Sequence, residues 1–564
     1  MTRFRIVEID LIDTLPLRIE SAPAHGVLPH GTLDRTSSAL EATETLRFSD
    51  LGYVDEAHRP YVPVVTQAFE IDRGISLTSD ALGGTSTFGS VTMINDGALD
   101  TLITQRANDH LPVRILTGEK RLDPERGVLV DPARSDLEPV FGGLGTLWQP
   151  GRRTLTIPLL GILSWLSVGL VSRIYGGTGG LDGDSNVSGQ TMPILRGSAC
   201  NITPVLIDAV NYVYQVSDAP AVVSALYEGG FAGGIAFAGA VADIYGQSPA
   251  PGTYVVQSGQ TGTWIRLGTR PVYGITVDAV GSFSSGASPV NVLDILRQML
   301  LEDFRMPAGY LDATWQETSQ LAPWAGGWFW SGSESVTGQD VVRTLLAGLG
   351  ISIVSTRSGT LRPVRLVQPL YGQETALTLT ADQITDIEPV SLDASLSPPT
   401  WRWRIGWQHN FTVQTAGSGL HPQAPAERQA IIGTADRYSV WAKTALRTQW
   451  RVPNDPAPIV TALASQDDAQ NLAGDHGLLW GAYRTLWAVT VPAHLAWQVD
   501  LGSLVSIQAP VPGLEVLTDG IVVSEHARAG DATVTLQILA TGVPADQSHL
   551  GDFNGDFMFN GDFM

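Results

Sequence analysis

Short apolar runs separated by glycine and proline dominate this chain and restrict it to a fold rich in strands and turns. Between Gly252 and Gly281 the sequence reads GTYVVQSGQTGTWIRLGTRPVYGITVDAVG, in which Tyr254, Val256 and Leu267 lie between glycine turns. Alternating apolar residues bounded by turn residues are typical of β-strands. With 60 Gly, 34 Pro and 16% charged residues, the chain is therefore predicted to be mainly β, with a smaller helical part (α+β).

The helical part is predicted within residues 286–400. The segment SPVNVLDILRQMLLEDF has the pattern of a helix with Ser288 as N-cap and Pro289 at the first helical position. The segment VTGQDVVRTLLAGLGISIV repeats this pattern, with Thr337 as N-cap and Asp340 three residues later, close to a capping box. These two segments predict a small helix-containing domain.

Three further local predictions concern single elements. The segment SIVSTRSGTLRPVRLVQP has the pattern of a β-hairpin that turns at Ser358 and Gly359. Ser465 is expected to cap a later helix. The segment WRWRIGW places Trp401, Trp403, Ile405 and Trp407 on one face of a strand and two arginines on the other. Such a ladder can bind a sugar or a flipped base, but packing beneath a sheet is the more common role and is expected here.

A chain of 564 residues is expected to form several domains. The composition along the chain predicts two tube-like β-barrel domains separated by a β insert and the helix-containing part. The expected divisions are an N-terminal arm at 1–45, a first β-barrel-like domain at 46–170, a β-rich insert at 171–285, an α+β domain at 286–400, a second β-barrel-like domain at 401–545 and a C-terminal docking tail at 546–564.

The formal net charge of −22, from 34 basic and 56 acidic side chains, argues against nucleic-acid binding by phosphate neutralisation. An acidic surface can instead line a conduit through which DNA passes without adhering, or it can simply keep the protein soluble. The single cysteine, Cys200, excludes an internal disulfide and a cysteine-based zinc cluster.

No segment has the pattern of a signal peptide or a membrane span. The N-terminal MTRFRIVEID alternates charged and apolar residues and lacks an apolar core. The most apolar run, IPLLGILSWLSVGLV at 157–171, is shorter than a bilayer span and contains Pro158. We expect this run to form core or subunit interface, and no stable membrane insertion.

The sequence predicts no catalytic, cofactor or metal site. It contains neither H-E-x-x-H nor G-x-S-x-G, and its Gly-rich segment YGGTGGLDGDSNVSGQ, at 175–190, lacks the G-K-[ST] ending of a phosphate loop. Asp182 and Asp184 in that segment can bind a cation, but solvated turn positions are the simpler interpretation. The protein is therefore predicted not to be an enzyme.

The final residues, GDFNGDFMFNGDFM at 551–564, have three possible interpretations: a metal loop, a disordered end or a docking peptide. Asp552, Asn554 and Asp556 match the first positions of an EF-hand loop, but Phe557 and Phe563 stand where the loop needs Gly and Glu. The docking interpretation is favoured because glycines let a backbone approach a neighbour closely. The predicted docking residues are Phe553, Phe557, Phe559 and Phe563.

Several segments resemble a family of tail proteins of long-tailed phages and prophages. They include SVTMINDGALDTL, YGGTGGLDGDSNVSGQTMPILRGSACNITPVLIDAVNYVYQVSD and GTWIRLGTRPVYGITVDAVG, followed by WRIGWQHNFTVQ and LWAVTVPAHLAWQVDLGSLVSI. In the family, the third segment has a Gly-x-Phe-Arg-Leu-Gly core, then Pro and a Thr-Ala-Asp-Val end. Here it reads Trp264-Ile265-Arg266-Leu267-Gly268, then Pro271 and Thr276-Val277-Asp278. The resemblance extends over residues 50–540.

The resemblance implies a structural virion protein, the central hub of a tail tip or baseplate, similar in plan to the hubs of contractile tails. Those hubs carry two tube-like barrels per chain and assemble as homotrimers, so that six barrels continue the tail tube. The implied partners are the distal tail protein, the tape-measure protein and tip or fibre proteins, with DNA present only in transit. The implied location is the distal end of the virion tail, after assembly in the host cytoplasm. The alternative is a tail-tip protein that binds or cleaves host-surface glycan through the insert or the tryptophans.

Overall fold

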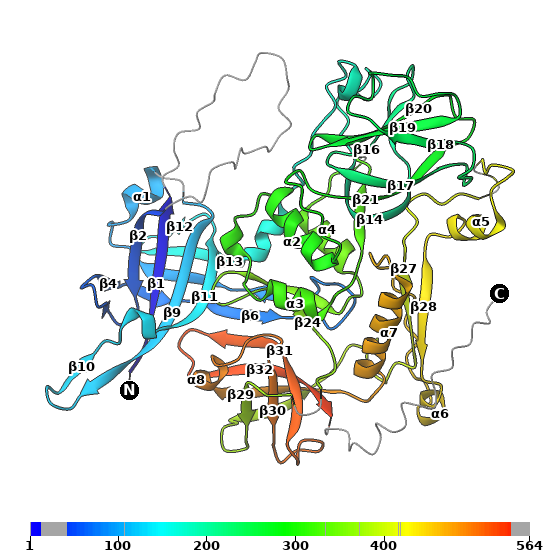
Figure 1. Cartoon of the computed structure of the whole chain (residues 1–564). Coiled ribbons are helices and arrows are strands. Elements are labelled where there is room, and N and C mark those ends of the chain that lie inside the picture. The colour runs from blue at the N-terminus through cyan, green and yellow to red at the C-terminus, as the bar shows by residue number, and fades with distance from the viewer. Residues whose placement is uncertain are drawn as a thin grey trace.

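A computed structural model describes residues 2–12, 42–105, 108–332, 334–370, 373–415, 417 and 419–542 of the chain (Figure 1). Strands predominate and helices are few, which confirms the predicted mainly β class. The strands form two large sheets and several smaller ones. In Figure 1 the first large sheet lies on the left, the second lies below the centre, and the insert lies at the upper right.

The first large sheet has eleven strands, and the long strands β1 and β9 lie at its centre. Strand β9 alternates buried and partly buried residues because its apolar positions, such as Val113 and Ile115, face the core. Two short strands lie beside the main path, β10 (Val128–Val130) on β9 and β12 (Gln149–Pro150) on β13. Along the main path the order is β3 (Tyr53–Val54), β4 (Pro60–Pro63), β2 (Ala42–Ser49), β1 (Thr2–Ile12), β9 (Leu111–Asp123), β11 (Glu138–Gly145), β13 (Thr154–Leu160), β8 (Ser90–Ile94) and β5 (Val65–Gln67).

The second large sheet has eight strands and combines segments from three distant parts of the chain. Its main path runs β25 (Leu377–Leu379), β30 (Leu504–Ile507), β31 (Thr518–Arg528), β32 (Thr533–Gly542), β29 (Thr485–Pro492) and β26 (Asp386–Val390). Strand β6 (Glu70–Gly74) pairs with β31, and β7 (Ser86–Thr87) pairs with β6. The chain therefore passes from the first sheet to the second between β5 and β6.

None of the sheets closes into a barrel within the described residues. The tube-like barrels expected at 46–170 and 401–545 are thus present as open sheets, because the strands at the two ends of each path do not pair with each other. Pairing also joins segments that the sequence analysis assigned to different units, since β1 lies between β2 and β9, and β6 lies on β31. The division into separate domains stays a prediction, because strand pairing alone does not test it.

The insert supplies most strands of two smaller sheets, in line with its predicted β character, and β22 from the helix-containing part completes one of them. Trp264, Ile265 and Leu267 on one of these strands are buried. One sheet has the order β17 (Ala221–Glu228), β21 (Ile275–Gly281), β14 (Ile194–Ile202) and β22 (Gly327–Trp330). The other has the order β15 (Val205–Asp208), β16 (Val213–Ser217), β20 (Gly262–Leu267), β19 (Thr253–Gly259) and β18 (Ala236–Ala240).

The helix-containing part carries α2 (Val292–Glu302), α3 (Trp315–Leu321) and α4 (Gly338–Leu346). The predicted start of α2 was wrong: Asn291, not Ser288, is the N-cap, because its side chain accepts a hydrogen bond from the Leu293 N–H. The capping box of Thr337 and Asp340 on α4 is confirmed. The hairpin of β23 (Ile351–Ser355) and β24 (Leu361–Arg365) is confirmed as well, with Gly359 at a positive φ of 84° in its turn.

A two-stranded ribbon, β27 (Arg402–Trp407) and β28 (Arg437–Ala442), packs on helix α7 (Gln466–Trp480). Ser465 caps α7, as predicted. Trp403 and Ile405 are buried, and Trp403 stacks on His476 of α7 with ring centroids 4.8 Å apart, which confirms the core-packing interpretation for these two residues. Trp401, directly before β27, and Trp407 at its end are only partly buried. The remaining helices are α1 (Asp100–Gln105), α5 (Ala426–Ile432), α6 (Leu446–Gln449) and α8 (Ala493–Ala496), with 3-10 turns at Arg134–Asp136, Ile162–Ser167, Gly180–Asp182 and Ala308–Tyr310.

One continuous apolar core connects both large sheets, the helices and the ribbon, and smaller clusters lie in the insert and beneath β1. The run at 157–171 divides between β13 and a 3-10 turn, and its residues Ile157, Ile162 and Leu166 belong to this core. Within the part of the chain that the structure describes, no helix has the length and apolar character needed to cross a membrane.

Candidate functional site

The most highly charged buried site lies where the second sheet meets the helix-containing part. Arg73 on β6 is opposite Glu525 on β31 in the strand register, so both side chains lie on the same face. The Arg73 guanidinium donates to Glu525 Oε2 from Nε at 2.8 Å and from Nη2 at 2.7 Å, and Nη2 also donates to Asp500 Oδ1 at 2.5 Å. Arg73 and Glu525 are both buried.

The β23–β24 hairpin supplies two more arginines to this site. Arg357 contacts Glu525 Oε2 at 2.9 Å and donates to the Val499 carbonyl at 2.7 Å. Its guanidinium also lies over the Trp497 ring, 4.7 Å from the centroid. Arg362 lies 3.7 Å from Asp500 and donates to the Leu501 carbonyl. We call these three arginines with Asp500 and Glu525 the junction cluster.

Oppositely charged neighbours shift the pKa values of Asp500 and Arg73 in the junction cluster. Burial raises the pKa of Asp500, but the positive charges of Arg73, Arg357 and Arg362 outweigh burial and lower that pKa below its ordinary value. Burial also lowers the pKa of Arg73, whereas Glu525 and Asp500 raise it, and the net direction is upward. These opposite shifts favour the charged forms of Asp500 and Arg73, and the cluster connects β6, β31 and the hairpin through charge-assisted hydrogen bonds.

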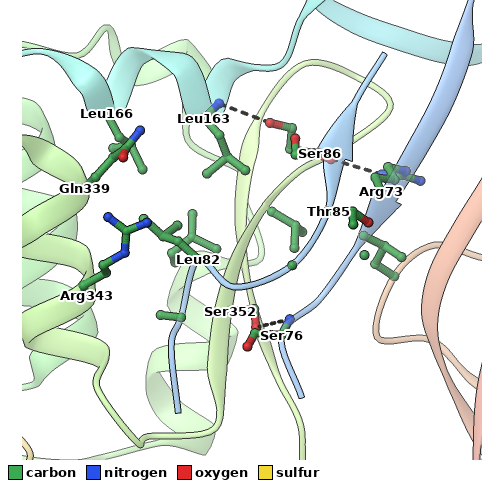
Figure 2. Close-up of a pocket in the computed structure, with 17 residues that line it drawn as sticks. Arg73, Ser76, Leu82, Thr85, Ser86, Leu163, Leu166, Gln339, Arg343 and Ser352 are labelled. Carbon is green, nitrogen blue, oxygen red and sulfur yellow. Dashed lines mark hydrogen bonds between the residues drawn. The ribbon is translucent and has the colours of Figure 1, made fainter. Parts of the chain in front are cut away.

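A cavity of about 120 Å³ lies beside the junction cluster (Figure 2). Figure 2 shows Gln339 and Arg343 of α4 on one side and Arg73 on the other. Ser352 Oγ accepts a hydrogen bond from the Ser76 N–H at 3.1 Å. The described lining contains hydroxyls, an amide and two guanidiniums, but no Asp, Glu, His or Cys. This cavity can offer hydrogen bonds and positive charge, and its lining supplies no group that transfers a proton near neutral pH.

A second cavity, of about 330 Å³, lies between the insert and the ribbon. Its lining is largely aromatic and aliphatic, and Phe411 packs edge-on against Phe329 with ring centroids 5.6 Å apart. Cys200 and His409 also line it, and His409 Nδ1 lies 2.8 Å from Asp436 Oδ1. A thiol and a His–Asp pair near one cavity are the residue types of a cysteine nucleophile site.

The environment of Cys200 does not activate the thiol. Burial raises its pKa above the ordinary value, and the Gln408 amide, rather than an imidazole, donates to Sγ at 3.0 Å. Nucleophilic cysteines need a lowered pKa and an adjacent base. The second cavity is therefore an apolar site with a protonated thiol in its wall.

The structure describes some of the residues that the sequence predicted as sites and not others. Phe553, Phe557, Phe559 and Phe563 lie outside the described residues, so their docking role stays a prediction. Asp182 folds back on its own loop, where it accepts hydrogen bonds from the Gly176 N–H at 2.9 Å and Thr178 Oγ1 at 2.7 Å. Across the described ranges, no group of three His, Cys, Asp or Glu side chains is placed to hold a metal ion.

Sequence reasoning missed both cavities and the junction cluster. Arg73 and Glu525 are 452 positions apart, and no local pattern marks either residue as buried. Arg357 lies in a segment predicted as a hairpin, next to the predicted turn at Ser358 and Gly359, and only 9% of the residue is exposed.

No protein-family model matches the chain, and no curated protein sequence matches it either. Solved structures that align with it include a 43 kDa tail protein of prophage MuSo2 from Shewanella oneidensis, at 11% identity over 86% of this chain and 95% of that chain, with a TM-score of 0.34. A tail protein from Neisseria meningitidis MC58 aligns at 11% identity over 85% and 95%, with a TM-score of 0.32. Prophage tail protein gp18 from Listeria monocytogenes EGD-e aligns at 7% identity over 89% and 97%, with a TM-score of 0.29. The chain is thus similar to these tail proteins over most of its length, at low sequence identity.

Proposed function

We propose that this protein is a structural virion protein, the central hub of a phage tail tip or baseplate. It continues the tail tube and joins the distal tail protein, the tape-measure protein and tip or fibre proteins. It acts as a homotrimer at the distal end of the tail, after assembly in the host cytoplasm. The sequence segments that resemble tail proteins of long-tailed phages support this role.

The observation that carries the proposal is the pair of large open sheets in one chain. A sheet with unpaired end strands offers backbone hydrogen-bonding groups to a neighbouring sheet. The first sheet ends at β3 and β5 and the second at β25 and β26. Three copies would bring six such sheets together, and a ring of six matches the plan of hubs that continue a hexameric tube. The junction cluster keeps the second sheet and the β23–β24 hairpin of one copy in a fixed relation, and a ring requires such rigid copies.

The projecting β9–β10 hairpin supports a role in assembly. Leu122, Val128, Leu129 and Val130 at its end are between 45% and 64% exposed. Figure 1 shows this hairpin extending away from the body of the first sheet. Clustered apolar side chains on a projecting element of a soluble protein are typical of interaction surfaces.

The acidic surface suits a DNA conduit. Under the proposal, carboxylates crowd the surface that faces the channel, so that phosphates pass without adhering. Their field weakens within about 8 Å at physiological salt, so the effect requires a narrow lumen. DNA is a partner only in transit, and the chain is proposed not to be an enzyme. The Gly-Asp-Phe segment, with Phe553, Phe557, Phe559 and Phe563, is proposed as a docking element.

The test is the oligomeric state and its location. Native mass spectrometry of the full chain, together with an averaged map of the virion, should show three copies around an axial channel at the distal end of the tail. A stable monomer or a hexamer in the mature virion would contradict the hub. A channel lined mainly by arginine would remove the conduit argument while leaving the hub intact.

An exposed aromatic ring on the insert favours the glycan-binding alternative. Phe237 on β18, in the insert, is 59% exposed, and its ring packs on Tyr254 with centroids 5.2 Å apart. Exposed aromatic rings are common sugar platforms. Incubation of the full chain with host polysaccharide distinguishes the two functions. A glycan-cleaving protein would release oligosaccharide, whereas a structural hub would release none.

A further inference from the structure

The region around helix α6 is strongly basic in an otherwise acidic chain. Residues 401–451 contain seven Arg or Lys side chains against two Asp or Glu, whereas the whole chain carries −22. Lys443, Arg447 and Arg451 are exposed and make no ion pair with any described residue. Unpaired cations clustered on one surface attract a partner of negative charge.

Aromatic rings lie among these cations. Arg447 lies over the ring of Trp401, 4.9 Å from its centroid. Trp450, directly after α6, stacks on Tyr483 with centroids 5.8 Å apart and an interplanar angle of 19°. Tyr483 is 59% exposed. We call Trp401, Lys443, Arg447, Trp450, Arg451 and Tyr483 the α6 surface; it offers ring faces and positive charges side by side.

The last described strand ends next to this surface. Arg484 donates hydrogen bonds to the carbonyl of Thr541, the penultimate residue of β32, and the adjacent Tyr483 belongs to the α6 surface. Residues 543–550 separate the end of β32 from the Gly-Asp-Phe segment. Eight residues of extended chain span roughly 26–29 Å, which is enough to pass from the Arg484 contact to the Trp450 ring.

We infer that the Gly-Asp-Phe segment, residues 551–564, docks on the α6 surface of its own chain. The chemistry of the two sides is complementary. The segment carries four Phe and three Asp side chains, and the α6 surface carries three aromatic rings and three unpaired cations. The Phe rings pack on the exposed ring of Tyr483 and on the partly buried rings of Trp401 and Trp450. Asp552, Asp556 and Asp562 meet Lys443, Arg447 and Arg451. This inference rests on the proposed docking role of the segment, and it does not depend on the hub proposal.

Photo-crosslinking of the full chain tests the assignment. The photoreactive residue p-benzoylphenylalanine replaces Phe557, a mixture of ¹⁵N-labelled and unlabelled copies is irradiated, and the crosslinked peptides are identified by mass spectrometry. The expected result is crosslinks within one copy to peptides containing residues 443–451 or Tyr483. The same probe at the exposed Phe237 of the insert is the control and should not label these peptides.

Charge reversal provides the second measurement. Arg447→Glu with Arg451→Glu should lower the crosslink yield by about tenfold, since each lost exposed ion pair is worth up to about 1 kcal/mol. Adding Asp552→Arg with Asp556→Arg to that variant should restore the yield. Arg152→Glu with Arg153→Glu, at an exposed turn before β13, is the matched control and should leave it unchanged.

The outcomes separate this inference from the docking role itself. Crosslinks to other surfaces, or between labelled and unlabelled copies, would overturn the own-chain receptor while leaving a docking segment in place. An absence of any crosslink from Phe557 would overturn both the receptor and the docking role. A charge reversal without effect on the yield would overturn the pairing with Arg447 and Arg451.

Discussion

Arg73 and Glu525 face each other across strands β6 and β31, and the Glu525 carboxylate accepts two hydrogen bonds from one guanidinium, at 2.7 and 2.8 Å. This single cross-strand pair connects a segment near the start of the chain to the second large sheet. Asp500, Arg357 and Arg362 surround the pair, so the attachment of the β23–β24 hairpin to the second large sheet includes an ionic network as well as apolar packing.

We expect Arg73→Met to destabilise the pairing of β6 with β31 by about 3–5 kcal/mol, because removal of one partner leaves a buried carboxylate without its main donor. Hydrogen exchange of the β6 and β31 amides, followed by mass spectrometry, should show faster exchange there than in β9. Arg528→Met is the matched control: Arg528 pairs with Glu70 on the same two strands at 2.6 Å, but both side chains are largely exposed. That change should cost about 0–1 kcal/mol. Equal effects of the two substitutions would contradict the importance of burial.

Acid should weaken the first sheet through Glu8. This buried carboxylate accepts hydrogen bonds from Tyr61 at 2.6 Å, from Arg134 at 2.6 and 2.7 Å and from Arg114 at 3.1 Å. Burial raises its pKa, but the hydrogen bonds from Arg134, Tyr61 and Arg114 outweigh burial and lower the pKa from 4.5 to about 2. A lowered pKa in the folded state means that the stabilisation is complete above pH 4.5 and is lost as the pH falls towards 2.

The Glu8 contribution is worth about 3 kcal/mol. Urea unfolding at pH 6 and at pH 3 should therefore differ less in Glu8→Gln than in the unaltered protein. Glu119→Gln is the control, because Glu119 pairs with Arg3 on neighbouring strands of the same sheet but is far more exposed. An unchanged pH dependence in Glu8→Gln would remove Glu8 as the cause.

Asp303 lies at the contact between α2 and the insert, and its contribution to stability should have the opposite pH dependence to that of Glu8. Its carboxylate accepts hydrogen bonds from Arg196 at 2.8 and 3.0 Å, and Arg196 also donates to Asp218 at 2.9 Å. Burial raises the pKa of Asp303 to about 6, despite the lowering effect of Arg196. A raised pKa in the folded state favours folding below pH 3.8, and this contribution is lost as the pH rises through 6.

Asp303→Asn should therefore remove the part of the pH dependence that lies between pH 4 and 6. The measurement is hydrogen exchange of β14 and α2 at several pH values, corrected for the intrinsic exchange rate. Glu302→Gln is the neighbouring control, and it should preserve most of the dependence because Glu302 contributes little to the pKa of Asp303 compared with burial. A pH profile of Asp303→Asn identical to that of the unaltered protein would contradict the prediction.

Arg484 should hold the end of β32 against helix α7. Its guanidinium donates to the carbonyls of Leu479 at 2.6 Å and Leu478 at 3.1 Å, to Gln368 Oε1 at 2.5 Å and to the Thr541 carbonyl. Burial lowers the pKa of Arg484 to about 10, so it stays charged at neutral pH. Arg484→Met leaves these buried acceptors without a charged donor, and we expect a loss of about 2 kcal/mol. Limited proteolysis should then cut near residue 542 sooner, whereas Arg152→Met at the exposed turn before β13 should not change the cutting rate.

The sequence by itself determined the local elements. The short apolar run around Trp264 and Ile265, bounded by glycine turns, predicted a strand, and every residue of β20 is buried. Thr337 with Asp340 predicted the start of α4 because a capping box satisfies free N–H groups there. Both signals lie within a few residues, so sequence reasoning can detect them. The start of α2 was misplaced by three residues because Ser288 and Asn291 are both good caps, and only the fold selects Asn291.

The tertiary structure alone decided which strands pair and whether a sheet closes. Nothing near Arg73 indicates that β6 leaves the first sheet and pairs with β31, because that choice depends on a partner 452 positions away. The same holds for the barrels predicted at 46–170 and 401–545: alternation shows that one face of a strand is buried, and it carries no information about the identity of the strand at its edge. Long-range pairing depends on how side chains from distant segments pack together across the whole core. The junction cluster and the two cavities are formed by such distant segments, so only the folded structure reveals them.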